Sequence, residues 1–324
     1  MNHQQTQAPL KLALVLNPGS GASSDDARAR VLELLESEPD SARIAATIEL
    51  GDGVDVDAAL GAALDAGADR IVACGGDGTV RACLQTALTR AVPLAVIPMG
   101  TANSFAAALG IRDVEHGCEV ARGANVARVD AARVNGEPMI LVASLGVHAE
   151  AIAKAKERGK DIFGNLAYVA SLAIEMSQAQ PFEVRLETRY GEATFDATAM
   201  SIANAARPGA LLSRGMGEVL DDDGQLDVTL VLARSFGEFL MAGAELALGT
   251  LTGVRVLGEQ VASFRASDLR VRCKPARKLL VDGEDLGSIE TLDLSCLAGA
   301  LLVAAPQLEG QGSVAEGAGL PAAS

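Results

Sequence analysis

Apolar residues in the first third of the chain form short continuous runs, separated by stretches with helical spacing. The runs are rich in Val, Ile, Leu and Ala, as buried strands are, and they cover residues 10–17, 42–50, 70–75 and 92–98. Between the first two runs, Val31, Leu34 and Leu35 follow Ser and Asp residues at the spacing of an amphipathic helix. Strands that alternate with helices in this way predict a mostly parallel sheet between helices.

From about residue 127 the pattern changes to apolar and charged residues in alternation, which is typical of half-exposed strands. Asn135 and Gly136, between two such stretches, predict a hairpin. Later stretches of the same kind are residues 182–189, 226–233 and 269–274, and helices are expected around 161–178 and 235–249. The predicted fold class is therefore α/β, with a mainly antiparallel β second half.

Length and composition fit two domains with a sizeable core. The chain has 324 residues, of which 49% are hydrophobic, 3% are aromatic and none is Trp. The net charge of −15 argues against a nucleic-acid partner and against broad adhesion to anionic lipid. One basic stretch, "RVRCKPARK" at 270–278, is either a local basic patch or, as the favoured interpretation, a solvated strand edge.

Cysteine usage and the termini favour a cytoplasmic location. The five cysteines have no metal or redox spacing, which fits reduced thiols; they are Cys74, Cys83, Cys118, Cys273 and Cys296. The N-terminus lacks the basic and apolar segments of a signal peptide, and no apolar stretch reaches spanning length. Residues 309–324 are rich in Gly, Ala and Ser and are expected to be disordered.

Glycine-bearing loops follow three of the predicted parallel strands. They are "NPGSG" (17–21), "GGDGT" (75–79) and "PMGTAN" (98–103). Ligands of open parallel sheets bind at the carboxyl ends of the strands, and glycine followed by a helix N-terminus can cradle a phosphate. One such loop is often only a tight turn, but three at one rim favour a phosphate site. Asp77 inside the second loop then implies a bridging Mg²⁺ or a hydroxyl to be deprotonated.

A series of motifs resembles, in order, those of the diacylglycerol kinase and sphingosine kinase catalytic family, in its small soluble bacterial form. The motifs are "LNPGSG", "GGDGT", "PMGTANSFA", "SLGVHAE", "FGNLAYVASL", "DDGQLDV" and "LLVDGE", and the match covers roughly residues 10–305. The "GGDGT" motif alone also occurs in NAD kinases. The opening "NPGSG" and the late "VDGE" favour the lipid-kinase branch.

The resemblance implies a three-layer ATP-binding domain over residues 1–126 and a β-sandwich-like substrate domain over 127–296. Residues 297–308 are candidates to return to the first domain. It also implies that the γ-phosphate of ATP is transferred, with Mg²⁺, to a lipid hydroxyl. The expected partners are ATP and a diacylglycerol-like or related lipid, met transiently at the inner membrane surface.

The resemblance carries over to individual residues. Glu284 matches the proton acceptor, Asp282 lies beside it, and Asp77 is the third catalytic candidate. The residues matched to ATP binding are Asn17, Pro18, Gly19, Ser20, Gly21, Thr47, Gly75, Gly76, Asp77, Gly78, Thr79, Gly100, Thr101 and Asn103. The side chain of Asp223 and the backbone carbonyls of Leu220 and Gln225 match a structural metal site. Without the resemblance, "VDGE" could be an ordinary β-turn and "DDDG" a solvated acidic turn.

Three positions depart from the family pattern. Arg81 stands where an Asn-Glu pair begins, and Ser104 and His148 replace aspartates associated with the acceptor or its metal network. These changes leave the expected ATP loops intact, so they affect the acceptor more than the nucleotide. Two alternatives to a lipid kinase stay open: an NAD kinase-like enzyme, and a nucleotide-binding regulatory protein without transfer activity. Asp77 together with "VDGE" speaks against the second.

Overall fold

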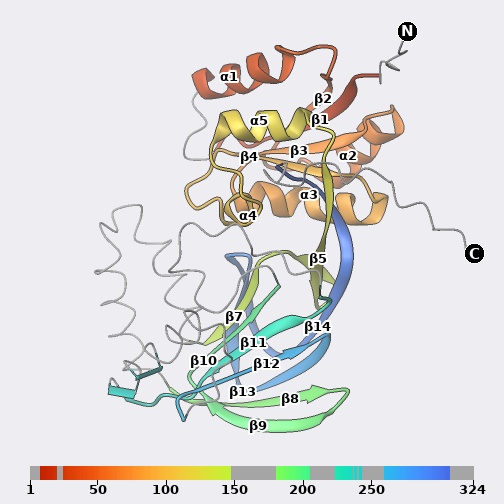
Figure 1. Ribbon diagram of the computed structural model, residues 1–324. Coiled ribbons are helices and arrows are strands. Elements are labelled where there is room, and N and C mark those ends of the chain that lie inside the picture. The colour runs from red at the N-terminus through yellow and green to blue at the C-terminus, as the bar shows by residue number, and fades with distance from the viewer. Residues whose placement is uncertain are drawn as a thin grey trace, which may run out of the picture.

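The computed structural model describes residues 8–19, 25–146, 180–204, 223–235, 237–238, 241–242 and 259–306. Its first part is a parallel sheet in the order β2-β1-β3-β4, formed by β1 (Leu10–Leu16), β2 (Ala42–Glu49), β3 (Arg70–Gly75) and β4 (Leu94–Pro98). The helices of this part are α1 (Asp25–Glu36), α2 (Val56–Asp65), α3 (Asp77–Arg90), α4 (Ser104–Ala108) and α5 (Val114–Arg122). In Figure 1, α1 and α5 cover one face of the sheet, and α2 and α3 cover the other.

The apolar runs of the sequence form the middle layer of this part. Leu12 and Leu14 of β1 are fully buried, as are Ile71 and Val72 of β3, because both strands lie inside the sheet and have helices above and below. The helices contribute their apolar stripes to the same core, for example through Leu35 of α1.

The second part of the molecule is antiparallel. Its strands are β5 (Val126–Val134), β6 (Glu137–Met139), β7 (Val142–Gly146), β8 (Phe182–Thr188), β9 (Gly191–Ala197), β10 (Ala199–Ala203), β11 (Leu226–Val231), β12 (Val261–Ala266), β13 (Asp268–Val281) and β14 (Glu284–Ala304). They enclose a second core in which Phe182, Val228 and Val271 are buried. The predicted fold class, a three-layer α/β part with a mostly parallel sheet followed by a mainly antiparallel part, is confirmed.

The two parts share one sheet because β14 runs through both (Figure 1). It pairs antiparallel with β13 and β5, and Val303 near its end pairs parallel with Leu94 of β4. The pairing with β5 slips between Leu297 and Leu301, where Gly299 has a φ of +56°. The buried Asp130 carboxylate accepts the backbone N–H of Gly299 at this slip, at 2.7 Å.

Two details differ from the sequence-based expectation. The Asn135-Gly136 hairpin is confirmed, with φ values of +50° and +90°, but its second strand is interrupted after Met139 and resumes as β7. Residues 270–272 of the basic stretch are not a strand edge, because they pair with β14 on one side and with β8 on the other. The helices expected around 161–178 and 235–249 lie wholly or mostly outside the described residues.

Candidate active site

The three glycine-bearing loops leave the sheet at the same rim. In the register of the parallel strands, Leu16 lies beside Cys74, and Cys74 lies beside Ile97. The loops are joined directly by backbone hydrogen bonds, from Asn17 N–H to the Cys74 carbonyl at 3.3 Å and from Met99 N–H to the Gly75 carbonyl at 2.9 Å. The first and third loops therefore flank the second.

Two of these loops touch through glycine backbones. An ideal Cβ built on Gly100 would lie 2.5 Å from the Cα of Gly76 and 2.8 Å from the Oδ1 of Asn103. A Cβ built on Gly75 would collide with the side chain of Thr79. Glycine is thus required at these positions by close approach of the chain to itself.

Polar side chains among the residues predicted to bind ATP form hydrogen bonds that fix the conformation of the loops. Asn17 accepts the N–H of Gly19 at 2.9 Å and donates to the Oγ1 of Thr79 at 3.3 Å. Thr79 is fully buried, so its hydroxyl lies beneath the loop. Asn103, with a φ of +49°, bonds both the N–H and the carbonyl of Gly100 at 2.8 Å. A ligand at this rim would meet mainly backbone, at the exposed Gly19, Gly78 and Thr101.

The first turn of α3 is available to an anion. The N-caps of α2 and α5 are Asp55 and Asp113, whose carboxylates accept N–H groups of their own helices at 2.9 and 2.8 Å. The N-cap of α3 is Gly76, which offers no side-chain acceptor. Helix N-termini carry unpaired N–H groups and the positive end of the dipole, so a phosphate here would take the role that aspartate has in α2 and α5.

Asp77 joins the second loop to the third. Its carboxylate accepts the backbone N–H groups of Ser104 and Phe105, both at 3.0 Å, at the start of α4. Each oxygen has one amide partner and can accept a further bond or a cation. Mg²⁺ in kinases is held by one or two carboxylates together with substrate phosphates, so Asp77 fits that ion. Within the described ranges, no three His, Cys, Asp or Glu side chains gather as a metal cluster.

The "VDGE" turn, residues 281–284 between β13 and β14, lies against the glycine loop of α3. An ideal Cβ on Gly78 would be 3.9 Å from the Oε1 of Glu284. Arg81, one turn further along α3, donates to the carbonyl of Val281 at 3.2 Å. Two segments about 200 residues apart in the sequence therefore form one site.

The Asp282 side chain is turned away from the rim and into the protein. The residue is 8% exposed, and its carboxylate accepts the N–H groups of Ile140, Leu141 and Val142 at 2.8–2.9 Å. Burial raises the pKa of this carboxyl, while the three amides and Arg81 act to lower it. The Asn204 side chain also donates to the carbonyls of Asp130 and Ile140. These side chains therefore bond backbone groups that could otherwise continue the pairing of β5 beyond Met139.

The remaining predicted site residues are less closely joined to this arrangement. Thr47 is exposed and lies inside β2, the edge strand of the parallel sheet. Pro18 is exposed beside Gly19. Ser20, Gly21, Leu220 and His148 lie outside the described residues, as does the helix expected around 161–178.

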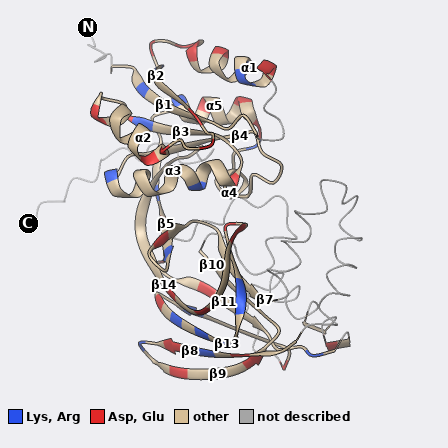
Figure 2. Cartoon of the chain, turned by 180° about the vertical axis from the view of Figure 1, so that it is seen from behind, with Lys and Arg blue, Asp and Glu red and all other residues tan. Residues whose placement is uncertain are grey.

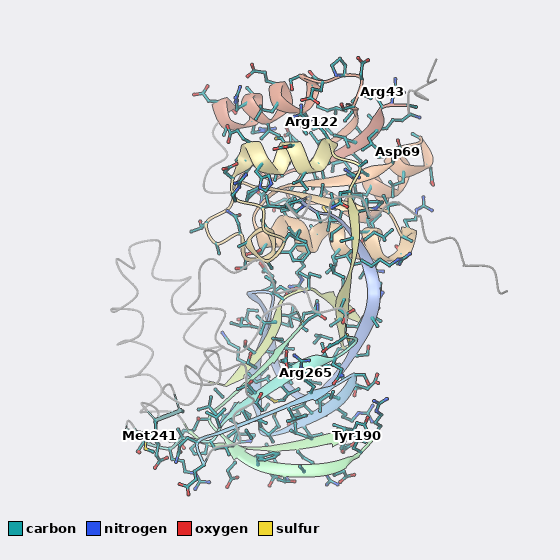
Figure 3. All side chains as sticks on the ribbon, in the orientation of Figure 1. Arg43, Asp69, Arg122, Tyr190, Met241 and Arg265 are labelled. Carbon is teal, nitrogen blue, oxygen red and sulfur yellow. The ribbon has the colours of Figure 1, made fainter. Side chains whose placement is uncertain are left out.

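The predicted metal ligand Asp223 already has partners on both carboxylate oxygens. One oxygen accepts the N–H of Gln225 at 3.0 Å, and the other forms an ion pair with Arg265. Arg265, labelled in Figure 3, also pairs with Asp227, with 2.7 Å between Nε and Oδ1. A cation at this turn would therefore compete with the guanidinium of Arg265.

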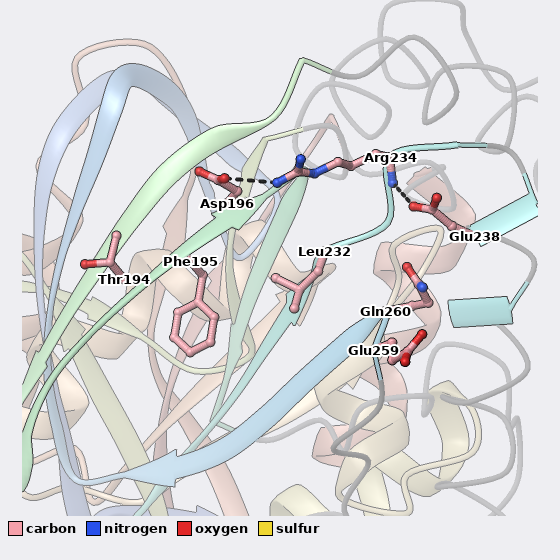
Figure 4. A pocket seen from close by; sticks show the side chains of 8 residues that line it. All are labelled: Thr194, Phe195, Asp196, Leu232, Arg234, Glu238, Glu259 and Gln260. Atoms are coloured by element: carbon pink, nitrogen blue, oxygen red, sulfur yellow. Dashed lines mark hydrogen bonds and ion pairs between the residues drawn. The ribbon is translucent and has the colours of Figure 1, made fainter.

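Two other candidate surfaces do not belong to the rim. The arginines of β13 alternate with acidic neighbours (Figure 2), as in the pairs Arg270–Asp293 at 2.6 Å and Arg272–Glu187 at 3.1 Å, so this face is not a uniform basic patch. A depression in the second part is lined by Thr194, Phe195, Asp196, Leu232, Arg234, Glu238, Glu259 and Gln260 (Figure 4). Its walls are mostly polar, which does not suit an acyl chain.

Sequence reasoning missed three residues that hold the turns on which predicted site residues lie. The sequence marks Arg81 only as a departure from the family pattern, because its partner Val281 lies 200 residues further along the chain. Asp130 anchors the turn before β11, where it accepts the N–H of Gly224 at 2.7 Å. Nothing in the sequence indicates the partners of Arg265, because Asp227 lies on the neighbouring strand β11 and Asp223 lies in the turn that precedes β11.

Comparison with known proteins decides the family. The profile described as "Diacylglycerol kinase catalytic domain" matches residues 11–134, and that described as "YegS C-terminal NAD kinase beta sandwich-like domain" matches residues 141–305. The chain belongs to the diacylglycerol kinase family. The resemblance found in the sequence is thus confirmed, and the second part is the β-sandwich-like domain of this family.

Relatives extend over most of the chain. A Pseudomonas aeruginosa protein named "Probable lipid kinase YegS-like" is 31% identical over 91% of this chain and 94% of its own. The "Diacylglycerol kinase" of Bacillus subtilis is 28% identical over 84% and 88%. An uncharacterized Synechocystis protein is 32% identical, and this chain spans 54% of its length. The crystal structure of a diacylglycerol kinase from Bacillus anthracis has the same fold, with a TM-score of 0.65, 17% identity and coverage of 91% and 97%.

Proposed function

We propose that this protein transfers the γ-phosphate of ATP to the hydroxyl of a lipid, and that the reaction takes place between the glycine loop of α3 and the VDGE turn. The observation that carries the proposal is the approach of the Glu284 carboxylate to Gly78. It puts a candidate proton acceptor beside the loop and helix N-terminus that suit a phosphate. Membership of a kinase family supports this assignment.

Each group at the site has a defined part in such a transfer. The acceptor oxygen forms a bond to the γ-phosphorus, the bond from that phosphorus to the bridging oxygen breaks, and the electron pair leaves with ADP. The hydroxyl proton passes to the carboxylate of Glu284. The α3 amides orient the phosphates, and Asp77 would hold Mg²⁺, which neutralises phosphate charge when bound. Asp282 holds the turn that carries Glu284.

The acceptor lipid of such a reaction lies in a membrane, so the protein has to meet the membrane surface. Within the described ranges, no helix combines the length and apolar character needed to cross a bilayer. The net charge of −15 disfavours strong adhesion to an anionic surface, so we expect a brief encounter with the membrane. Ser104, which replaces an aspartate of the family pattern, lies exposed beside Asp77, where it would influence the choice of headgroup.

A phosphate-transfer assay tests the proposal. Labelled γ-phosphate is followed from ATP and Mg²⁺ to a panel of lipids in micelles, to NAD, or to no added acceptor. We expect label in at least one lipid. Label in NAD alone would support the NAD kinase-like alternative, and ATP binding without any release or transfer of label would leave only a nucleotide-binding function.

A further inference from the structure

One face of α3 lies against the second domain. Gly78, Arg81 and Gln85 follow one another at spacings of three and four residues, which places them on the same side of the helix. Each meets a residue of the β-rich part: Gly78 faces Glu284, Arg81 donates to the Val281 carbonyl, and Gln85 accepts from Arg133 at 3.3 Å. This face is the direct connection between the phosphate loop and the turn that carries the candidate base.

Arg81 bonds the VDGE turn itself. The turn is held from below by Asp282, whose carboxylate takes three amides and whose own N–H donates to the Val142 carbonyl at 2.9 Å. Asp282 also has a φ of +49°, so the chain reverses sharply there. Arg81 bonds the same turn from the side of α3, and its charge acts on Asp282. The turn is thus fixed from both domains.

We propose that Arg81 is a positioning residue that fixes the VDGE turn against the glycine loop and so places Glu284 beside the acceptor hydroxyl. This inference rests on the proposed function. A guanidinium suits the task because its planar, always charged fork can donate to a carbonyl and still face a carboxylate. A neutral side chain of similar length would leave the Val281 carbonyl without this donor and the turn free to shift relative to α3.

Replacement of Arg81 tests the inference by kinetics. In Arg81→Met we expect kcat to fall about 10- to 100-fold, because a shift of about 1 Å in a catalytic group costs this much. The KM for ATP should change less than about twofold, since the loops that bind nucleotide are untouched. Arg81→Lys should recover a substantial part of kcat. The matched control is Arg90→Met, in the last turn of the same helix, where the arginine pairs with Asp65; we expect wild-type kinetics.

Amide hydrogen exchange tests the same contact without reference to activity. In Arg81→Met we expect exchange to accelerate about tenfold at residues 140–142 and 281–284 relative to Arg90→Met, with unchanged protection in the parallel sheet. Unchanged exchange at these amides would overturn the inference, whatever the kinetics. A uniform loss of protection in both domains would also overturn it, because Arg81 would then be a general stabiliser. Wild-type protein that labels no lipid would refute the proposed function separately.

Discussion

Gly76 and Gly100 meet backbone to backbone, so closely that a Cβ on Gly100 would lie 2.5 Å from the Cα of Gly76. This contact sets the distance between the second and third loops of the nucleotide rim. A methyl group on Gly100 would force the loops apart and displace Asn103, which clamps Gly100, and a methyl group on Gly76 would press on the Cα of Gly100 at 3.2 Å. The spacing of the rim is therefore determined by the absence of side chains.

Gly100→Ala should accordingly weaken ATP binding and lower the free energy of unfolding by about 1–3 kcal/mol, the usual cost of overpacking. Calorimetric titration with ATP and chemical denaturation measure the two effects. The control is Gly61→Ala in α2, where a Cβ meets nothing within 4 Å. It should be neutral or raise stability by about 0.5–1 kcal/mol. Wild-type ATP affinity in Gly100→Ala would show that the contact does not shape the site.

Asp77→Asn should remove phosphate transfer and loosen α4. The amide that replaces the carboxylate has one acceptor oxygen for the two N–H groups of Ser104 and Phe105. We expect a loss of about 1 kcal/mol in the free energy of unfolding, together with a loss of turnover that is far larger than this instability explains. Asp55→Asn, at the N-cap of α2, is the control for the loss of stability alone, because its carboxylate also accepts a backbone N–H group. Near-normal turnover of Asp77→Asn in a lipid assay would rule out the assignment of this loop.

The sequence predicted the layers and the rim because their causes are local. Apolar runs, helical spacing and glycine-rich strand ends lie within a few residues of one another, and parallel strands bring their ends to one edge. The approach of Glu284 to Gly78 could be expected only through the family resemblance, since it joins segments about 200 residues apart. The ion pair between Asp223 and Arg265, at the turn where a cation was expected, was not predictable, because nothing in the sequence around Arg265 indicates its partner.

The interrupted hairpin shows the same limit on a smaller scale. Residues 137–144 continue the apolar pattern of a strand, and the sequence alone predicts one uninterrupted partner for β5. At the interruption, the amides of Ile140 and Leu141 donate to the carboxylate of Asp282, about 140 residues away, and the Ile140 carbonyl accepts from the side chain of Asn204. A long-range acceptor overrides the local strand propensity here.

Glu284→Gln should lower kcat about 10²- to 10⁴-fold if the carboxylate accepts the hydroxyl proton, because glutamine is not a base. ATP affinity should stay within a factor of about two, since the amides of α3 are unaffected. The matched control is Asp285→Asn at the next residue. That carboxylate pairs with Lys278 at 2.9 Å, which lowers its pKa, and it accepts the N–H of Gly287. Equal turnover in both variants would remove Glu284 from the mechanism.

Asp282 should give the protein a distinct pH dependence. Burial raises the pKa of this carboxyl in the folded state above 3.8, the value of an ordinary aspartate. The folded state therefore binds the proton more tightly than the unfolded state, so this group's contribution to stability falls as pH rises from 3.8 through the raised pKa. The free energy of unfolding of the wild type minus that of Asp282→Asn should therefore decrease as pH rises from 3.8 through the raised pKa.

Denaturation at a series of pH values measures this difference. Arg81 acts to lower the pKa of Asp282, so the background Arg81→Met should move the window to higher pH. A difference between wild type and Asp282→Asn that is flat or grows with pH would show that the three amides, and not burial, dominate the pKa of this group.

The turn at Asp223 makes the last prediction, which concerns metal removal. Arg265 bridges Asp223 and Asp227 and so supplies positive charge where the family resemblance implies a cation. Because the guanidinium already occupies this turn, we expect EDTA to leave the free energy of unfolding of the wild type unchanged. Arg265→Gln leaves two carboxylates without their guanidinium, and it should regain roughly 1 kcal/mol of unfolding free energy when Mg²⁺ is about five times its Kd.

The control for this experiment is Arg270→Gln, which removes an arginine from a single carboxylate partner, Asp293, on the same β-rich domain. A single carboxylate with no substrate phosphate beside it binds Mg²⁺ only weakly, so the stability of this variant should not respond to Mg²⁺. If the wild type is itself stabilised by Mg²⁺ and Asp223→Asn removes that effect, then the ion displaces Arg265, and Asp223 is a metal ligand as the resemblance implies. Because the guanidinium and the ion compete for the same oxygen, the two outcomes exclude each other.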